Sequence, residues 1–535
     1  MLKLFRLLGS GRPRLVVLVL PVFFAIACLI LILSSQHLYN NNNNPRIRVP
    51  GRRPGSQKLN DWWTEFFERL SRTRVTAHAV KLRDNAPGIN WKPETTASRP
   101  ELLQLGEDDE LKFYQSHGSF IHQLPLFANH LPFDANTTGI VTTAGERNFG
   151  QVISLVLVTR RAGSRLPIQI ILNSSAPWVD LVCAHTMPRF DATCVFLEDE
   201  WTAPSLRQLL PKLERFQWKI ISIIASTFQN VLFLDADCLP VRNPDPIFDQ
   251  GSEPFTSTGL ITFPDFWTST ASSLFYKIAG FEVPAISSRA TSESGVLVYD
   301  KARHADTLLL AAYYNHNGPS HYYPMFSQHG PGEGDKETFL QAALVLEALQ
   351  RRKVYQQPTT WMKPGIGVKK GYWDVKMFPS VLGRSESEKG TWTGMFIRQM
   401  DPMEDYRAVM AAVEKAGGRP TDDDEFLTDS AFLATVGNLT LEHDHSRVMF
   451  FHHNGVKPDF TRITDSKSGI VMINEGKYLR MWESPDWMIR DFGWDVEKVL
   501  WEDSIAVYCQ PEMAQFRQLQ KVCEKMQSIY EKVYT

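Results

Sequence analysis

The sequence has almost no net charge and very little cysteine. Its 535 residues include 57 Lys and Arg against 59 Asp and Glu, a formal charge of −2 at pH 7. A nucleic-acid-binding protein needs a basic excess to neutralise phosphates, so this balance excludes nucleic acid as a partner. Six cysteines are too few for a fold held together by disulfides. With 43% hydrophobic residues, the composition is that of a globular protein that recognises its partners through local sites.

One segment contains no charge at all. Residues 15–33 read LVVLVLPVFFAIACLILIL, which is long enough to cross the hydrocarbon core of a bilayer as a helix. A cleaved signal peptide is the alternative, but the run is longer than a signal core and no convincing small-residue cleavage site follows it. Only basic charges precede the segment, so the positive-inside rule predicts a cytosolic tail at 1–14 and a lumenal remainder, which is a type II topology.

The segment after the span is rich in Asn, Pro, Gly and Arg and cannot form a core of its own. We expect a lumenal stem over residues 34–105, with one amphipathic helix at 61–71, and a large folded domain over 106–535. The lumen is oxidising, so cysteines that lie close in sequence favour disulfides. The expected pairs are Cys183 with Cys194 and Cys509 with Cys523, and Cys238 would stay free.

From Gly139 onward the sequence alternates between short β-branched runs and helical spacing of apolar residues. This alternation predicts an α/β domain with a mostly parallel sheet flanked by helices, a nucleotide-binding architecture whose ligands lie at the carboxyl ends of the strands. The predicted strands are 139–145, 168–172, 193–199 and 231–234, and the predicted helices are 148–161 and 213–228.

Two carboxylates follow the last of these strands. Asp235 and Asp237 come directly after the apolar residues 231–234, and both can face the same way. Such close acids repel one another unless a cation lies between them, and oxygen ligands suit Mg²⁺ or Mn²⁺ beside a diphosphate. The alternative is that they are ordinary turn residues. The Pro-containing turn after them and two further polar sites favour the metal.

The second polar site follows another apolar strand, residues 448–451. It reads HHNGVKP, in which either His452 or His453 offers an imidazole to a metal and Lys457 offers a positive charge to a phosphate.

The third site is GPGEGDKETF at 330–339, a glycine loop that opens a helix predicted from about 337 to 351. It lacks the glycine spacing and the Ser/Thr after lysine of a Walker phosphate loop, which excludes that motif. A fourth point, Glu293-Ser294-Gly295, is either a plain turn or a polar stretch that faces the cleft.

Together these motifs resemble those of the fungal Golgi α-mannosyltransferases of glycosyltransferase family 71. The resemblance implies a GT-A fold, which is a Rossmann-like nucleotide-sugar-binding domain, with GDP-mannose as donor, Mn²⁺ as cofactor and retention of the α-anomeric configuration. It also implies a single-pass Golgi membrane protein with a lumenal domain, and complexes with other Golgi mannosyltransferases as partners. The resemblance runs from 139 to 459 through GIVTTAGERN, Lys219, LDADCLPVRNPDPIF, FPDFW, ESGVLVYDK, YYN, GEGDKETF and FFHHNGVKP.

The same resemblance implies roles for individual residues. Asp235 and Asp237 would hold the metal and the nucleotide sugar, and His452 would be the third metal ligand. Cys238 departs from the expected pattern, which has a polar residue such as Asn at this place. Asp335 would lie near the reacting sugar. The further donor-contacting or pocket-lining residues would be Lys457, Lys219, Glu293, Asp265 and Trp267, and the neighbours of Asp335, whose roles stay open, are Glu333 and Glu337.

The predicted function is transfer of mannose from GDP-mannose to the mannose residues of N-glycan outer chains or cell-wall mannan. An α-1,2 linkage is preferred, because GEGDKETF and FPDFW are more similar to that branch of the family, and α-1,3 transfer is the alternative. Two rivals belong to other classes. A glycoside hydrolase also needs paired carboxylates, but normally with no metal between them, and a non-catalytic mannan-binding membrane protein could share the fold without turnover.

Overall fold

The computed structural model describes most of the chain from residue 56 onward, and the described residues belong to one compact unit, Val49–Thr535. The predicted membrane span at 15–33 lies outside them. Among the helices of the described part, none combines the length and the apolar character that a membrane span requires. The described residues are 56–89, 91, 97–173, 176–287, 289–349, 355–356, 373–376, 394–415, 447–453, 456–465, 468, 470–474, 477–482 and 485–535.

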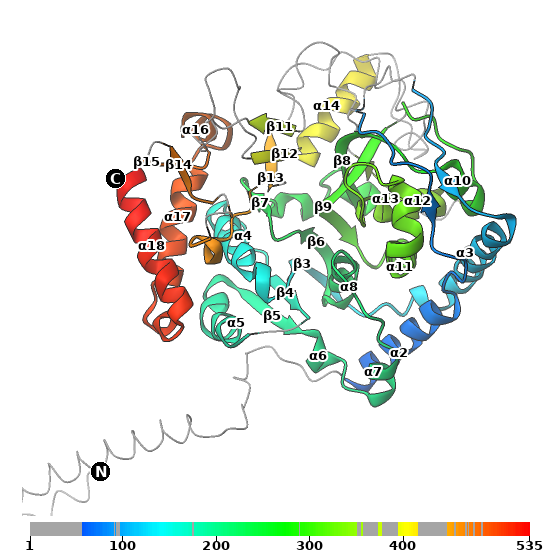
Figure 1. Ribbon diagram of the computed structural model, residues 1–535, viewed down its shortest axis with the longest axis horizontal. Coiled ribbons are helices and arrows are strands. Elements are labelled where there is room, and N and C mark those ends of the chain that lie inside the picture. Colours follow the sequence, from blue (N-terminus) through cyan, green and yellow to red (C-terminus); the bar gives the residue numbers. More distant parts are fainter. Residues whose placement is uncertain are drawn as a thin grey trace, which may run out of the picture. The chain divides into compact units, whose positions relative to one another are not determined.

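A seven-stranded mixed sheet forms the core of this unit, in the order β10-β8-β9-β6-β3-β4-β5 (Figure 1). β9 is antiparallel to both of its neighbours, and the other pairs are parallel. The predicted α/β domain with a mostly parallel sheet is therefore confirmed. The strands are β3 (Asp134–Ala144), β4 (Ile168–Leu172), β5 (Ala192–Phe196), β6 (Phe228–Leu234), β8 (Leu260–Thr268), β9 (Ala290–Asp300) and β10 (Tyr355–Gln356).

Side chains of this sheet alternate between two hydrophobic clusters. In β6, Leu232 and Leu234 belong to the cluster that includes α4 (Phe149–Arg161), α17 (Val496–Tyr508) and α18 (Arg517–Val533). Val231 and Phe233 belong to the opposite cluster, which includes α8 (Gln217–Ala225), α11 (Ala305–His316) and α13 (Lys336–Ala348). Helices thus cover both faces, and each fully buried large apolar side chain contributes about 1.5–3 kcal/mol.

A smaller, antiparallel sheet in the order β11-β12-β13-β7 adjoins the carboxyl end of β6. Its strands are β7 (Cys238–Pro240), β11 (Trp373–Lys376), β12 (Gly394–Met400) and β13 (Val448–His453). Two short ribbons pair β1 (Lys81–Leu82) with β2 (Leu103–Gln104) and β14 (Met472–Asn474) with β15 (Lys477–Leu479). The other helices are α5 (Pro177–Leu181), α6 (Leu197–Glu200), α7 (Pro204–Leu209), α9 (Phe255–Thr258), α10 (Ser273–Ala279), α12 (Tyr323–Ser327), α14 (Pro402–Lys415) and α16 (Asp486–Phe492).

The predicted boundaries of the helix before β6 need correction. The helix expected over 213–228 is the shorter α8, which starts only at Gln217. Arg215 has φ = +44°, a left-handed conformation that a regular helix cannot contain, so the helix begins after it. Ser226 is extended and ends the helix. Phe228 therefore begins strand β6 instead of ending the helix. The helices predicted at 148–161 and 337–351 correspond to α4 and α13.

The segment expected to be a loose stem is folded onto the domain from Gln57 onward. The predicted amphipathic helix is α2 (Gln57–Arg72), whose N-cap Ser56 accepts a hydrogen bond from the Leu59 N–H. Its apolar face packs in the same cluster as α8 and α11, together with α3 (Glu107–Ala128). The structure thus differs from the expectation of a loose stem up to Leu105, because the aromatic residues of α2 are buried through their contacts with the domain.

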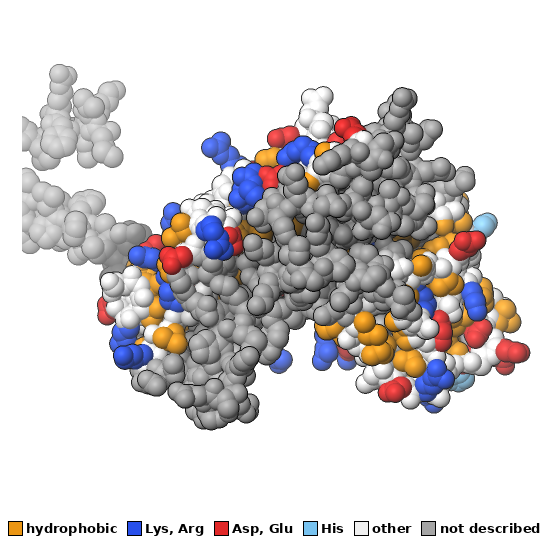
Figure 2. Space-filling view, turned by 90° about the horizontal axis from the view of Figure 1, so that it is seen from above, with side chains coloured by type: hydrophobic (Ala, Val, Ile, Leu, Met, Phe, Trp, Pro, Cys, Tyr) orange, Lys and Arg blue, Asp and Glu red, His pale blue; other side chains and the backbone are white. Residues whose placement is uncertain are grey.

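Both expected disulfides are present. Cys183 is bonded to Cys194 and Cys509 to Cys523, and Cys238 is free and buried. On the face shown in Figure 2, basic and acidic side chains are interspersed over the described surface.

Candidate active site

Asp235 and Asp237 lie where the chain passes from the main sheet to the smaller sheet. β6 ends at Leu234, and β7 begins at Cys238. The Asp235 N–H donates to the carbonyl of Gly295 in β9 (2.8 Å), and the Cys238 N–H donates to the carbonyl of Asp235 (2.9 Å). These bonds fix a tight turn that holds both carboxylates at the carboxyl end of β6, the edge at which α/β proteins bind ligands.

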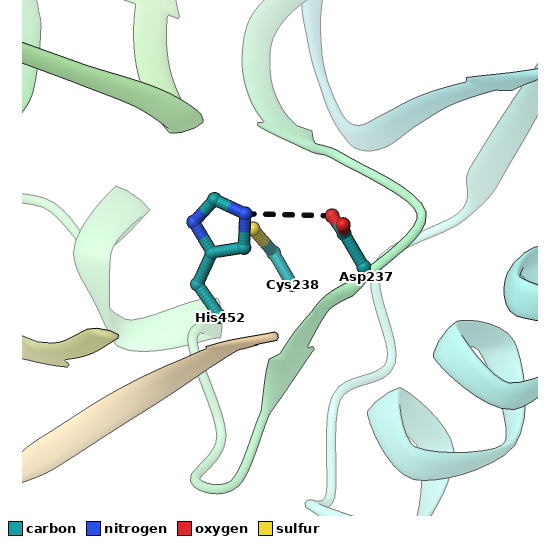
Figure 3. Close-up of side chains that lie close together, drawn as sticks. All are labelled: Asp237, Cys238 and His452. Carbon is teal, nitrogen blue, oxygen red and sulfur yellow. Dashed lines mark ion pairs between the residues drawn. The ribbon is translucent and has the colours of Figure 1, made fainter. Parts of the chain in front are cut away.

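The two histidines of β13 face opposite sides of the smaller sheet, because successive side chains of a strand alternate. His452 lies opposite Cys238 of β7 in the antiparallel register, and its Nε2 is 3.5 Å from Oδ1 of Asp237 (Figure 3). The ring centroid of His453 is instead 5.1 Å from that of Trp482, and burial lowers the pKa of His453 to about 3. His452 is therefore the imidazole at the predicted metal site.

The Glu293-Ser294-Gly295 stretch lies inside β9, so the interpretation as a plain turn is wrong. The Glu293 carboxylate accepts hydrogen bonds from the N–H groups of Ser294 (2.9 Å) and Gly295 (2.6 Å), and it lies 3.5 Å from Nδ1 of His452. A Cβ atom at Gly295 would lie 2.6 Å from Sγ of Cys238 and 2.8 Å from Cε1 of His452. Glycine is thus required for this close approach of β9.

A buried lysine joins two of the predicted site carboxylates. Nζ of Lys219, on α8, lies 3.0 Å from Oδ2 of Asp235 and 3.1 Å from Oδ2 of Asp335. It also donates to the carbonyl (2.9 Å) and the hydroxyl (2.8 Å) of Ser294. Burial lowers the pKa of Lys219, but the surrounding carboxylates outweigh it and raise the pKa above its ordinary value. Lys219 is therefore a fixed positive charge that holds α8, β6 and α13 together.

Lys457 is the second lysine of the site. It donates to the carboxylate of Asp237 and to the carbonyl of His453. Burial and the carboxylates of Asp237 and Asp335 raise the pKa of Asp235, against the opposing effect of Lys219.

The charge of the site fits a divalent cation. Four carboxylates face two ammonium groups and one imidazole, which leaves a formal charge of −2 when the imidazole is counted as neutral. A partly buried excess of negative charge destabilises the folded protein unless a cation offsets it. The carboxylates are Asp235, Asp237, Glu293 and Asp335, and the other groups are Lys219, Lys457 and His452. Donor atoms of Asp237, Cys238 and His452 all lie within 4.8 Å of one another.

The first residues of α13 carry alternating charges, and each forms an ion pair with a different element. Asp335 contacts Lys219 of α8, as described above. Nζ of Lys336 lies 2.8 Å from Asp265 of β8, and Glu337 lies 3.0 Å from Arg289, just before β9. Of the three acids predicted near the reacting sugar, Asp335 joins the Lys219 cluster, whereas Glu337 has its ion pair elsewhere.

The remaining predicted residues lie around this cluster. Glu333 accepts a hydrogen bond from the hydroxyl of Ser327 (2.6 Å) and contacts Nδ1 of His329 (2.7 Å). Asp265 is engaged by Lys336, and Trp267 is half-buried in β8 beside Gly88, where an added Cβ would lie 3.1 Å from the indole ring.

Sequence reasoning missed one contributor to the site. Cys238 was treated only as a departure from the expected pattern, but its thiol lies beside His452. Ser294 belongs to the predicted polar stretch 293–295, but its contacts with Lys219 through both its carbonyl and its hydroxyl were not predicted. The antiparallel pairing of β7 with β13, which brings Cys238 to His452, has no signal in a single sequence.

Comparison with known proteins finds similarity to mannosyltransferases. The family model Mannosyl_trans3, described as a mannosyltransferase, matches residues 137–289 and 284–370. Alpha-1,2-mannosyltransferase MNN21 of Candida albicans is 28% identical over 76% of this chain, and alpha-1,2-mannosyltransferase MNN2 of Saccharomyces cerevisiae is 28% identical over 78%. The chain is thus similar to mannosyltransferases over residues 137–370 and, at lower identity, over most of its length. It spans 63% of the length of MNN21 and 74% of that of MNN2.

The matched family model and both relatives are mannosyltransferases, the class of enzyme that the motifs predicted. Solved structures similar to part of this chain include glycosyltransferases. The glycosyltransferase GlyE of Streptococcus pneumoniae TIGR4 covers 42% of this chain and 47% of its own, at 14% identity and a TM-score of 0.26. The α/β class rests on the sheet itself.

Proposed function

We propose that the protein is a retaining α-mannosyltransferase that transfers mannose from GDP-mannose to a mannose-terminated acceptor in α-1,2 linkage. The observation that carries the proposal is the similarity, over more than three quarters of the chain, to proteins named as α-1,2-mannosyltransferases. The proposed acceptors are N-glycan outer chains or cell-wall mannan, as the family resemblance of the sequence motifs implies.

The proposal includes a GT-A type of domain with a divalent cation, Mn²⁺, at the carboxyl end of β6. Asp235, Asp237 and His452 would hold the ion, and the excess of carboxylates around them supports this assignment. When bound, the ion supplies a Lewis acid that offsets the charge of the diphosphate.

The protein's own residues would then position the reactants. Lys457, placed beside Asp237, would contact the diphosphate of the departing nucleotide. The acceptor hydroxyl would attack the anomeric carbon from the face that the nucleotide leaves, so positioning and electrostatics account for most of the acceleration. Asp335 would lie near the reacting sugar, and its ion pair with Lys219 fixes its orientation. A double displacement through Asp335 or Glu333 is the alternative mechanism.

We further propose a single-pass type II protein of the Golgi membrane with its folded domain in the lumen. The uncharged segment at 15–33 and the basic residues before it support this topology. The two disulfides support an oxidising compartment. Complexes with other Golgi mannosyltransferases are part of the same proposal.

The test is a transfer assay with GDP-mannose and an α-1,6-mannobiose acceptor, with the product linkage read by NMR. We expect an α-1,2-linked product that depends on Mn²⁺. Asp237→Ala should reduce transfer by at least about 100-fold, the scale seen when one preorganised electrostatic group is removed. Asp249→Ala, at an exposed carboxylate outside the site, is the matched control.

An α-1,3 product would overturn the linkage, and full turnover by the Asp237→Ala protein would overturn the metal assignment. Binding of mannan without any transfer would favour the non-catalytic alternative.

A further inference from the structure

We propose that Asp237, Cys238 and His452 form a binding site for a thiophilic divalent cation such as Zn²⁺ or Cd²⁺. The three side chains alone define this site, so it can bind an ion whether or not the protein transfers mannose.

The register of the smaller sheet brings these ligands together. Cys238 and His452 are directly opposed across the antiparallel pair β7–β13, so their side chains lie on the same face of the sheet. Asp237 precedes Cys238, and its Oδ1 is 3.5 Å from Nε2 of His452. One donor atom from each residue lies within 4.8 Å of the others. Figure 3 shows the three side chains close together.

The surroundings leave these donors available. Cys238 is fully buried and takes part in neither disulfide. His452 is 6% exposed, and its Nε2 faces Oδ1 of Asp237 at 3.5 Å, which is longer than the usual hydrogen-bond distance of about 2.7–3.2 Å. An ion between these two atoms would complete the contacts of both. Gly295 provides the room, because any Cβ there would contact both Cys238 and His452.

The donor set favours a different ion from the one proposed for catalysis. A thiolate, an imidazole and a carboxylate are the ligands of Zn²⁺ sites, and three protein ligands leave one position open. Mn²⁺ prefers oxygen ligands and stands at the weak end of the affinity series of divalent metals. As the sulfur–metal bond forms, the S–H bond of Cys238 breaks and its proton passes to solvent.

One consequence rests on the proposed function. Asp237 and His452 would be ligands of both ions, so Zn²⁺ or Cd²⁺ and Mn²⁺ would exclude one another. A thiophilic ion would then inhibit the Mn²⁺-dependent enzyme.

The experiment is a Cd²⁺ titration of the metal-free, full-length protein, followed by the sulfur-to-cadmium charge-transfer absorbance in the ultraviolet. Cys28 is the other cysteine outside the two disulfides, so Cys28→Ser serves as the parent. We expect the parent to develop the band and to saturate at one ion per chain. Adding Cys238→Ser should abolish the band and weaken Cd²⁺ binding at least about 100-fold, since loss of even an indirect partner of a metal ligand costs 10–100-fold.

Cys238→Ala in the same parent guards against misfolding caused by the buried hydroxyl, and circular dichroism verifies the fold of each variant. His452→Gln should weaken Cd²⁺ binding but keep the sulfur band at saturating Cd²⁺. Absence of the band in the parent, or a band that persists in folded Cys238→Ser and Cys238→Ala proteins, overturns the site. None of these readouts uses mannose transfer, so failure of the site and failure of the proposed function are distinguishable.

Discussion

The packing of the site requires a residue without a side chain at position 295, which is Gly295. It lies in the buried strand β9, and its carbonyl accepts the Asp235 N–H. We predict that Gly295→Ala reduces mannose transfer and Mn²⁺ binding by at least about 100-fold, because the new methyl group would displace the side chains of Cys238 and His452. The measurements are kcat in the transfer assay and Mn²⁺ binding by electron paramagnetic resonance.

Gly118→Ala provides the matched control. Gly118 lies in helix α3, and an added Cβ would meet nothing within 4 Å. This variant should be neutral or more stable by up to about 1 kcal/mol, since alanine is the better helix former. Equal losses of transfer in the two variants would contradict the steric explanation at Gly295.

At the scale of single residues, the sequence predicts which side chains lie together better than it predicts their orientation. Asp235, Asp237 and His452 were predicted to meet because each follows an apolar strand, and the structure brings Asp237 and His452 to within 3.5 Å of one another. The choice between His452 and His453 needed the exact end of β13, which includes both residues. Cys238 escaped recognition as a neighbour of His452, because β7 and β13 are about two hundred residues apart in the chain.

At the scale of elements, two acids at the start of α13 have different ion-pair partners, and the sequence alone could not distinguish their roles. Asp335 pairs with Lys219, which also contacts Asp235, whereas Glu337 pairs with the buried Arg289 and accepts the Ser292 N–H. Asp335 therefore belongs to the site, and Glu337 anchors the helix to β9.

We predict different consequences for Asp335→Asn and Glu337→Gln. Asp335→Asn should lower kcat at least about 100-fold with little change in stability, because Lys219 keeps its ion pair with Asp235. Glu337→Gln should destabilise the fold by about 3–5 kcal/mol, because Arg289 would be left buried without its counter-charge. Thermal unfolding and transfer measured on the same preparations test the pair. A large drop in kcat of Glu337→Gln at unchanged melting temperature would reverse these roles.

The sequence predicts the ends of an element where the pattern of apolar residues changes there. It does not predict them where a backbone dihedral angle sets the end. The termini of α4 followed from the apolar pattern, and α2 was found from its amphipathic spacing. The late start of α8 depends on the left-handed conformation of Arg215, for which an arginine side chain gives no sign.

At the scale of the whole molecule, α2 belongs to the folded domain. Trp63, Phe66 and Phe67 are almost completely buried, and the Trp63 ring lies 5.5 Å from that of Trp201. The side chain of Asn60 accepts hydrogen bonds from the N–H groups of Thr202 (3.0 Å) and Ala203 (2.9 Å). The composition of 34–105 suggested a stem because it averages a polar region with this helix.

This packing predicts where the chain tolerates truncation. A protein that begins at Ser56 keeps α2 and should unfold cooperatively, whereas one that begins at Gly106 lacks α2 and exposes the apolar surface that α2 covers. Each buried aromatic residue of α2 contributes about 1.5–3 kcal/mol, and the total stability of a domain is about 5–15 kcal/mol, so the shorter protein should aggregate or lose cooperative unfolding. Differential scanning calorimetry and size-exclusion chromatography of the two proteins measure this. Equal melting temperatures would show instead that α2 docks without stabilising the domain, and would restore a boundary near Leu105.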